Sequence, residues 1–93
     1  MIDSGSCDSN GYEMLGSKIE CDQAASDLGL LDTSAYESQT NGRPYGCIYA
    51  DNDWLNWYSP GGPHPSASCG SYHWGSNYKC ICRIGIYSNN NRF

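Results

Sequence analysis

Small and apolar residues recur with helical spacing in "SKIECDQAASDLGLL", which begins at Ser17. At a period of 3.6 residues, one face collects Cys21, Ala24, Ala25 and Leu28. Ser17 and Glu20 fit a capping box, in which each side chain satisfies a backbone N–H that the helix leaves unpaired. Gly29 is a natural stop, because glycine accepts a positive φ without a Cβ clash. The pattern predicts one helix whose alanines allow a sheet to approach closely.

Other stretches have the composition or alternation of strands. They are "GYEML" (11–15), "YGCIY" (45–49), "WLNWY" (54–58) and "NYKCICRIGIY" (77–87). The Asp-Asn-Asp sequence between the second and third stretches predicts a hairpin turn. The polar stretch 30–43 and the proline-rich stretch 59–68 predict loops.

These elements predict an α+β fold, with one helix packed on a short antiparallel β-sheet. We expect a single domain over 1–93, with a core of about 4–83 and a C-terminal extension over 84–93. The chain has few large apolar residues besides its Tyr and Trp: five Leu, six Ile, one Phe and no Val. Their combined fraction of the sequence is below the level of about 20% under which disorder becomes the default expectation. Eight Tyr, three Trp and six Cys argue for a folded, disulfide-stapled domain, because aromatic rings bury large areas and small domains rely on disulfides.

The cysteines also indicate an oxidising location, extracellular or at the cell surface. A net charge of −5, with only five scattered Lys and Arg, argues against nucleic acid as a partner. The chain has no apolar run of about 18 residues, so we do not expect it to insert into a membrane. The start "MIDSGSCDSN" lacks the features of a signal peptide, so we expect a mature form or a piece of a longer chain. No Asn-x-Ser/Thr sequon occurs, so N-glycosylation is not expected, and the exposed loop 60–65 is the place to look for O-linked sugar.

A longer pattern covers residues 4–83. It comprises a Gly-x-Cys start, a helix with Glu-Cys, Ala-Ala and Leu-Gly-Leu, a Pro-x-x-Cys aromatic strand, a strand with Leu and Asn, and a closing Cys-x-Cys. Its positions are Gly5, Cys7, Glu20, Cys21, Ala24, Ala25, Leu28, Gly29, Pro44, Cys47, Leu55, Asn56, Cys80 and Cys82. The chain thereby resembles a cysteine-rich module repeated in extracellular proteins of algae and other protists. The resemblance implies a surface or matrix building block and no catalytic residue, although a single copy departs from the tandem arrangement.

Six cysteines allow many pairings. Two of them, in the Cys-x-Cys of 80–82, share one face of a strand and lie too close to pair with each other. We favour Cys69–Cys80 closing the loop around Trp74, Cys21–Cys47 joining helix to sheet, and Cys7–Cys82 fastening the N-terminal segment. The alternative is a zinc site of Cys69, His73, Cys80 and Cys82. Its spacing is unusual and it leaves an odd thiol, so we expect no metal or cofactor.

The acidic turn suggests two kinds of chemistry. Asp51, Asn52 and Asp53 offer oxygen ligands for Ca²⁺, but one turn supplies too few of the roughly 6–8 oxygens that this ion binds. Asp51 and Asp53 also fit the separation of about 5–10 Å between glycosidase carboxylates, but no cleft is indicated. The even cysteine count disfavours a thiol nucleophile for His64 or His73. The sequence therefore predicts a turn and a non-enzymatic protein.

Aromatic side chains dominate the predicted hairpin. Alternation puts Trp54, Asn56 and Tyr58 on one face of its second strand, and Leu55 and Trp57 on the other. The first face has the mixed aromatic and amide character of a sugar-stacking platform, and also that of a protein interface, where Tyr and Trp are enriched. A sheet that is buried on both faces explains the same pattern, and the sequence leaves the three interpretations open.

The leading functional hypothesis is a non-enzymatic structural module that self-assembles into a cell-surface filament, sheath or matrix. The stretch "RIGIY" supports it, because Ile84 and Ile86 follow the last cysteine and are free to pair with the sheet edge of a neighbouring copy. Trp74 is a further candidate contact residue. The alternative is a carbohydrate-binding module that uses the face around Trp54 and Tyr58, with glycans as partners. A membrane-active peptide is disfavoured because the chain is acidic.

Overall fold

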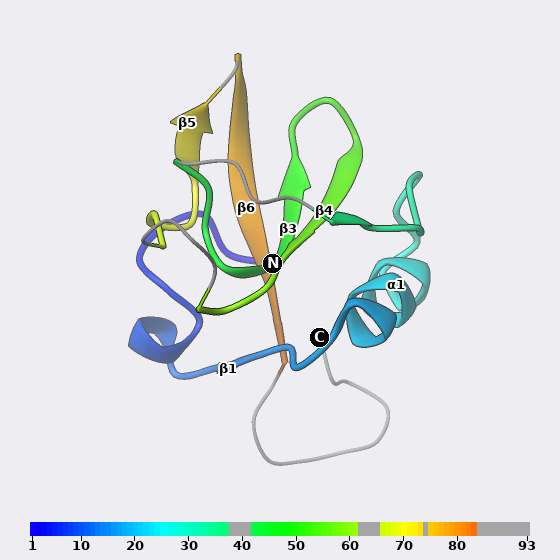
Figure 1. Ribbon diagram of the computed structural model, residues 1–93, viewed down its shortest axis with the longest axis horizontal. Coiled ribbons are helices and arrows are strands. Elements are labelled where there is room, and N and C mark those ends of the chain that lie inside the picture. The colour runs from blue at the N-terminus through cyan, green and yellow to red at the C-terminus, as the bar shows by residue number, and fades with distance from the viewer. Residues whose placement is uncertain (38–41, 62–65, 74, 84–93) are drawn as a thin grey trace.

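The computed structural model describes residues 1–37, 42–61, 66–73 and 75–83. This part of the chain forms a curled sheet with one α-helix beside it (Figure 1). In order, its elements are η1 (Asp8–Asn10), β1 (Glu13–Met14), α1 (Lys18–Asp27), β2 (Tyr36–Glu37), β3 (Gly46–Ala50), β4 (Trp54–Tyr58), β5 (Ser71–His73) and β6 (Ser76–Arg83). The predicted combination of one helix, one sheet and disulfides is confirmed, with more strands than expected.

The sheet has the strand order β1-β6-β3-β4-β2, and β5 also pairs with β6. The predicted hairpin is present, and β3 and β4 pair Cys47 with Trp57 and Tyr49 with Leu55. The expectation of a short antiparallel sheet is met only in part, because β2 runs parallel to β4 while the other strand pairs are antiparallel. β2 lies in a stretch that was expected to be loop, and its two residues are too few for alternation to be visible in the sequence.

β6 is enclosed on both sides. β3 pairs along one side of it, while β5 and β1 pair near its two ends on the other. Between them Ile2 exchanges two backbone hydrogen bonds with Cys80, with N···O distances of 2.8 and 2.9 Å. The N-terminal segment lies so close that a Cβ at Gly70, whose φ is +84°, would overlap the backbone oxygen of Asp3. Gly70 is therefore required both for its φ and for the close approach.

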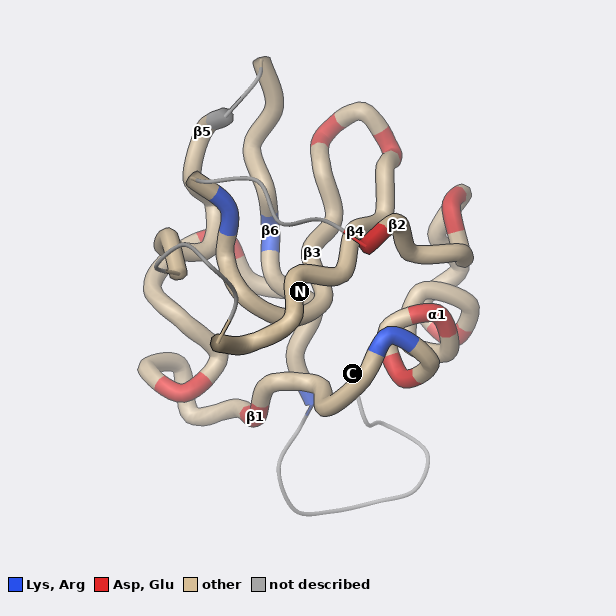
Figure 2. Tube along the Cα trace, viewed as in Figure 1, with Lys and Arg blue, Asp and Glu red and all other residues tan. Residues whose placement is uncertain are grey.

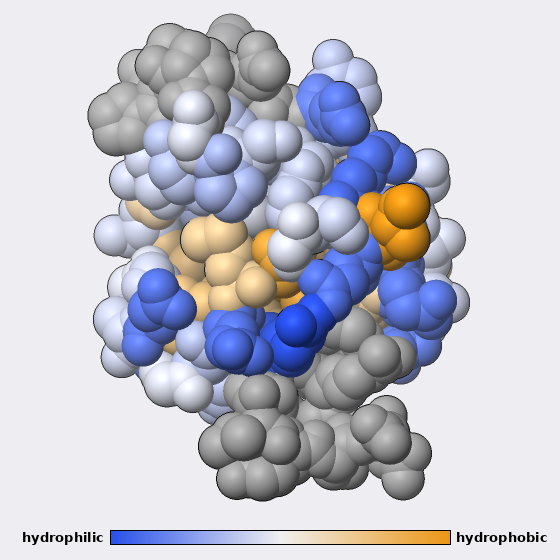
Figure 3. All heavy atoms as spheres, turned by 60° about the horizontal axis from the view of Figure 1, so that its bottom comes forward, coloured by the Kyte–Doolittle hydropathy of each residue, from blue (hydrophilic) through white to orange (hydrophobic). Residues whose placement is uncertain are grey.

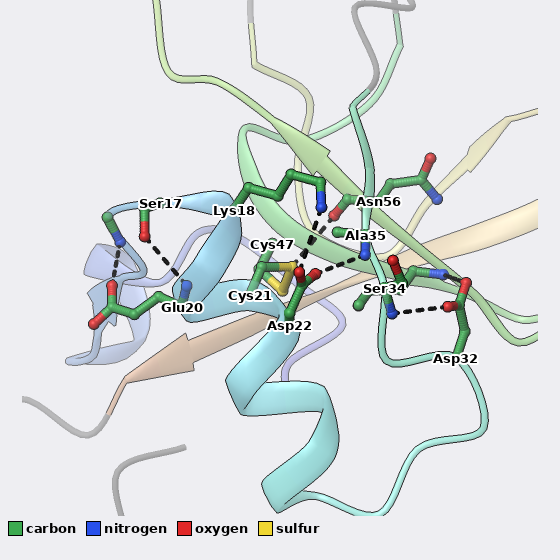
Figure 4. Close-up of a disulfide and its surroundings, with 12 residues drawn as sticks. Ser17, Lys18, Glu20, Cys21, Asp22, Asp32, Ser34, Ala35, Cys47 and Asn56 are labelled. Carbon is green, nitrogen blue, oxygen red and sulfur yellow. Dashed lines mark hydrogen bonds and ion pairs between the residues drawn. A yellow bond between two sulfur atoms is a disulfide. The ribbon is translucent and has the colours of Figure 1, made fainter.

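Helix α1 begins at the predicted cap. The Ser17 hydroxyl oxygen accepts a hydrogen bond from the backbone N–H of Glu20 at 3.2 Å. The Glu20 carboxylate in turn accepts one from the N–H of Gly16 at 2.7 Å, one residue before the cap (Figure 4). Gly29 follows the helix with a φ of +72°. The Ser17 cap and the glycine stop are thus as predicted, whereas Glu20 binds the N–H of Gly16 in place of that of Ser17.

The buried face of α1 consists of small side chains. It contains Cys21, Ala24 and Ala25, all without exposed surface. Leu28 was expected on the same face but is 38% exposed, because it forms the C-cap beyond the regular turns of the helix. The small residues let the helix backbone approach the sheet closely.

Both faces of the sheet are buried. The helix side contains Leu15, Cys21, Ala24, Ala25, Ala35, Cys47, Tyr49, Leu55, Trp57 and Ile81. The opposite side contains Cys7, Ile48, Ala50, Cys69, Tyr78, Cys80 and Cys82, with Ile2 and Trp54 packed against them. Aromatic rings and half-cystines provide much of both clusters, which compensates for the shortage of aliphatic residues.

All six cysteines form disulfides in the predicted pairing, Cys7–Cys82, Cys21–Cys47 and Cys69–Cys80. The disulfide Cys21–Cys47 joins α1 to β3 on the helix side of the sheet (Figure 4). The other two end on β6 on the opposite side. The disulfides remove the thiolates that the alternative zinc site requires.

Candidate functional site

The predicted sugar-stacking platform is mostly buried. Trp54, Asn56 and Tyr58 do share one face of β4, but neither Asn56 nor Tyr58 has exposed surface, and Trp54 is half-buried. Tyr45 packs edge-on against Tyr58, with ring centroids 4.9 Å apart. Of the three interpretations that the sequence left open, the sheet buried on both faces fits Asn56 and Tyr58, and Trp54 alone of the three stays partly exposed.

Arg43 is one of the residues that cover this face of β4. It is 5% exposed, and its guanidinium carbon lies 4.8 Å from the ring centroid of Tyr78 and 5.4 Å from that of Trp54. Its Nη1 donates to the amide oxygen of Asn56 at 3.4 Å. A cation over aromatic faces is worth up to about 2 kcal/mol when water is excluded. Arg43 thus takes a place in the interior that an aliphatic side chain would normally fill.

Tyr36 extends this stack to the surface. Its ring centroid lies 5.6 Å from that of Trp54, the two planes are tilted by 37°, and Tyr36 is 58% exposed. We call Tyr36 and Trp54 together the aromatic ledge. Behind the ledge, the Arg43 guanidinium lies over the Trp54 ring.

Two carboxylates hold the chain that carries Tyr36. Asp22 of α1 accepts a hydrogen bond from the backbone N–H of Ala35 at 2.7 Å. Asp32 accepts one from Ser34 at 3.0 Å and another from Leu55 of β4 at 3.0 Å. Figure 4 shows this connection between helix, loop and sheet. An exposed aromatic ring is therefore fixed on a rigid backbone, which lowers the entropy lost when a ligand binds.

The acidic turn is used structurally. Asp53 has a φ of 62° and accepts a hydrogen bond from the Tyr49 hydroxyl at 3.1 Å. Asp51 accepts one from the backbone N–H of Asn77 at 3.2 Å. Burial raises the pKa of Tyr49, and the hydrogen bond to Asp53 and its negative charge raise this pKa further. These contacts agree with the predicted turn, and over the described ranges no group of three His, Cys, Asp or Glu side chains is placed to hold a metal ion.

The charged residues on the side of the molecule that carries β2 are mainly acidic. Figure 2 shows acidic residues on α1, on the β3–β4 turn and at β2. The basic side chains near the helix are paired, Lys18 with Asp22 at 3.3 Å and Arg83 with Glu20. In Figure 3 the visible apolar area is narrow and bordered by hydrophilic residues. The acidic side of the molecule thus disfavours an anionic ligand near β2.

Several predicted contact residues lie outside the described part of the chain, namely Trp74, Ile84 and Ile86. Within that part, no helix is long and apolar enough to cross a membrane. Comparisons with protein-family models, curated proteins and solved structures give no significant match.

Proposed function

We propose that this chain is a non-enzymatic extracellular binding module whose aromatic ledge contacts neutral carbohydrate. The observation that supports it is Tyr36, which is 58% exposed although two carboxylates fix its backbone and Trp54 supports its ring. An exposed ring that is held in place in this way is suited to contact a ligand.

Carbohydrate fits the chemistry of the ledge. Binding sites combine apolar or aromatic surface with a few polar groups, and a sugar ring offers C–H groups to the aromatic faces and hydroxyls to polar neighbours. Glu37 and Asp53 adjoin the two ledge residues along the chain, so the ledge lies in an acidic part of the molecule. Their negative charge opposes sulfated or uronic acid glycans, because the nearby cation, Arg43, is buried.

The disulfides support an extracellular location. Three disulfides in a chain of 93 residues are typical of small domains that fold in oxidising compartments. Such a module keeps its binding surface in place without a large core, which suits a protein that works outside the cell.

A glycan array tests the proposal with a matched pair of variants. Tyr36→Ala removes the exposed half of the ledge, and we expect binding to neutral glycans to weaken by about two- to twelvefold, because an aromatic contact contributes about 0.5–1.5 kcal/mol. Tyr72→Ala is the control, because Tyr72 is 74% exposed but lies on β5, away from the ledge. Equal losses in both variants, a preference for sulfated glycans, or no bound glycan at all would contradict the proposal.

The second candidate function is a self-assembling structural subunit. The lengths of the outer strands limit which sheet edges could pair with another copy. β1 and β2 have two residues each, and such short edges resist pairing with another chain. Assembly by strand addition would therefore depend on the β-prone sequence after β6, which includes Ile84 and Ile86.

Light scattering and electron microscopy of the non-reduced protein test this candidate. Filaments or large regular particles that disappear when residues 84–93 are deleted would support it. A monomer near the chain mass of 10.2 kDa would count against it while leaving the glycan proposal untouched.

A further inference from the structure

The fold separates the tyrosines into buried and accessible groups. Tyr49, Tyr58 and Tyr78 are at most 8% exposed, and Tyr45 is half-buried. The accessible ones are Tyr12 at 39%, Tyr36 at 58% and Tyr72 at 74%. Reactions at a tyrosine ring carbon require that the ring edge be reachable, so Tyr36 and Tyr72 are the most reactive phenols in the described part of the chain.

The sheet places these two tyrosines on opposite sides of the molecule. Tyr36 is on β2 and Tyr72 on β5, with β6, β3 and β4 between the two strands. Four steps between neighbouring strands separate them by roughly 19 Å along the sheet. Figure 2 shows β5 and β2 on different sides of the central strands.

The two side chains also project to different faces of the sheet. Tyr36 is in register with Asn56, which shares its face of β4 with Trp54. Tyr72 is in register with Asn77, and alternation along β6 puts Asn77 on the same face as Ile81, the helix side. The two phenols therefore cannot meet within one chain, and a bond between a Tyr36 and a Tyr72 must join two molecules.

No free thiol competes for an oxidant. All six cysteines are in disulfides, and no free cysteine is present. A phenol that loses an electron on this surface is therefore not repaired by a neighbouring thiolate.

We propose that Tyr36 and Tyr72 are sites of oxidative cross-linking between modules, driven by hydrogen peroxide and a haem peroxidase. Each phenol gives up one electron and one proton to the peroxidase, and two tyrosyl radicals from different chains join through ring carbons ortho to their hydroxyls. After the rings regain aromaticity, two tyrosines have formed one carbon–carbon bond and lost two hydrogen atoms in all. One hydrogen peroxide is reduced to two water molecules.

Two sites on opposite sides make the module bivalent. Each phenol contributes one bond, so a chain with both sites extends a linear polymer, whereas a chain with one site stops at a dimer. The inference rests on tyrosine placement alone and is independent of glycan binding.

The test treats the purified protein with hydrogen peroxide and a haem peroxidase, and follows products by reducing gel electrophoresis and dityrosine fluorescence. Tyr87 lies outside the described residues, so every variant is made on a Tyr87→Phe background. That background should form a ladder of oligomers. Tyr36→Phe or Tyr72→Phe should each stop at dimers, and the double variant should lose at least nine-tenths of the linked product.

Two controls make the outcome decisive. Tyr12→Phe removes the next most exposed phenol and should leave the ladder intact, and peroxide without peroxidase should give none. Because Tyr12, Tyr36 and Tyr72 are exposed, replacing them by Phe on the common background should leave circular dichroism and thermal unfolding unchanged. A ladder that persists in the double variant, or peptide mass mapping that places the new bond on other tyrosines, would overturn the proposal.

Discussion

On one face of the sheet, helix α1 contributes two alanines and a half-cystine to a cluster that includes Leu55 and Ile81, and a single disulfide joins the helix to the sheet. On the other face no helix covers the described strands, and the N-terminal segment and Arg43 lie there instead, with two disulfides. The helix side is closed by regular packing. The opposite side is closed by covalent links and a buried cation, and at its margin Tyr36 and Trp54 stay accessible.

The difference shows where this small domain has room for function. A helix that packs on a sheet buries a continuous stripe and leaves little surface for a ligand. Irregular segments cover a sheet less completely, so aromatic rings at the boundary remain partly exposed. The side that is harder to stabilise is the side that presents a candidate binding surface.

Removal of disulfides should give the largest effects and should separate the two faces. Replacing Cys7 and Cys82 by serine opens a link with a sequence separation of 75 residues, and we expect a loss of about 4.5 kcal/mol in the free energy of unfolding. Replacing Cys21 and Cys47 opens a separation of 26, with an expected loss of about 3.5 kcal/mol. Urea unfolding measures both.

The order of these two losses is the informative result. If the variant without Cys7–Cys82 does not fold, its circular dichroism spectrum shows this directly, and its stability is then lower than that of the variant without Cys21–Cys47. A larger loss on the helix side would mean that packing, rather than the entropy of the unfolded chain, determines what each disulfide contributes.

Arg43→Met tests whether the buried cation stabilises the helix-free face. The change keeps much of the side-chain length but removes the contacts with the rings of Trp54 and Tyr78 and the donor to Asn56. We expect a loss of about 2 kcal/mol in the free energy of unfolding, measured with urea. Lys79→Met is the control, because Lys79 is a half-buried cation on β6, and it should change stability by about 0.5 kcal/mol or less. Equal effects would show that Arg43 has no special role.

The smallest effect should appear on the helix side, at alkaline pH. The pKa of Tyr49 is raised in the folded protein, so the folded state holds this proton more tightly than the unfolded chain. The stability from Tyr49 is complete below the ordinary tyrosine pKa of about 10 and is lost as pH rises through the folded value. Unfolding by urea between about pH 8 and pH 11 should show a shallower decline for Tyr49→Phe than for the wild type. Parallel declines would contradict the assignment.

The features predictable from the sequence are those set by local chemistry. The helix cap at Ser17 and the hairpin follow from patterns of a few residues, whereas the three disulfides match a pairing that was favoured among many. The spacing of Cys80 and Cys82 helped to predict the disulfides, because both side chains point to the same face of the strand. On that face Cys80 pairs with Cys69 and Cys82 pairs with Cys7. Local rules are sufficient where neighbours in sequence decide the structure.

The features that were missed depend on long-range contacts. β2 has no alternation of its own, and it forms because Asp22 and Asp32 hold the chain beside β4. From the sequence alone, Arg43 would be expected at the surface, because arginine is seldom buried unless it has partners. Its aromatic partners Trp54 and Tyr78 are not its neighbours in sequence, so they could not be identified. The face of Trp54, Asn56 and Tyr58 was correctly grouped, but what covers it depends on those same distant segments.

The disulfide Cys7–Cys82 also determines how the domain responds to mechanical force. A pull on the two ends of the chain enters at Cys7 and leaves at Cys82, so the bond carries the load and the residues between them feel almost no tension. Those residues would otherwise lengthen by roughly 3.3–3.6 Å each when drawn out. When the oxidised protein is stretched from its ends, the segment between Cys7 and Cys82 should not extend. After reduction of the disulfides, the same segment should unfold and extend under force.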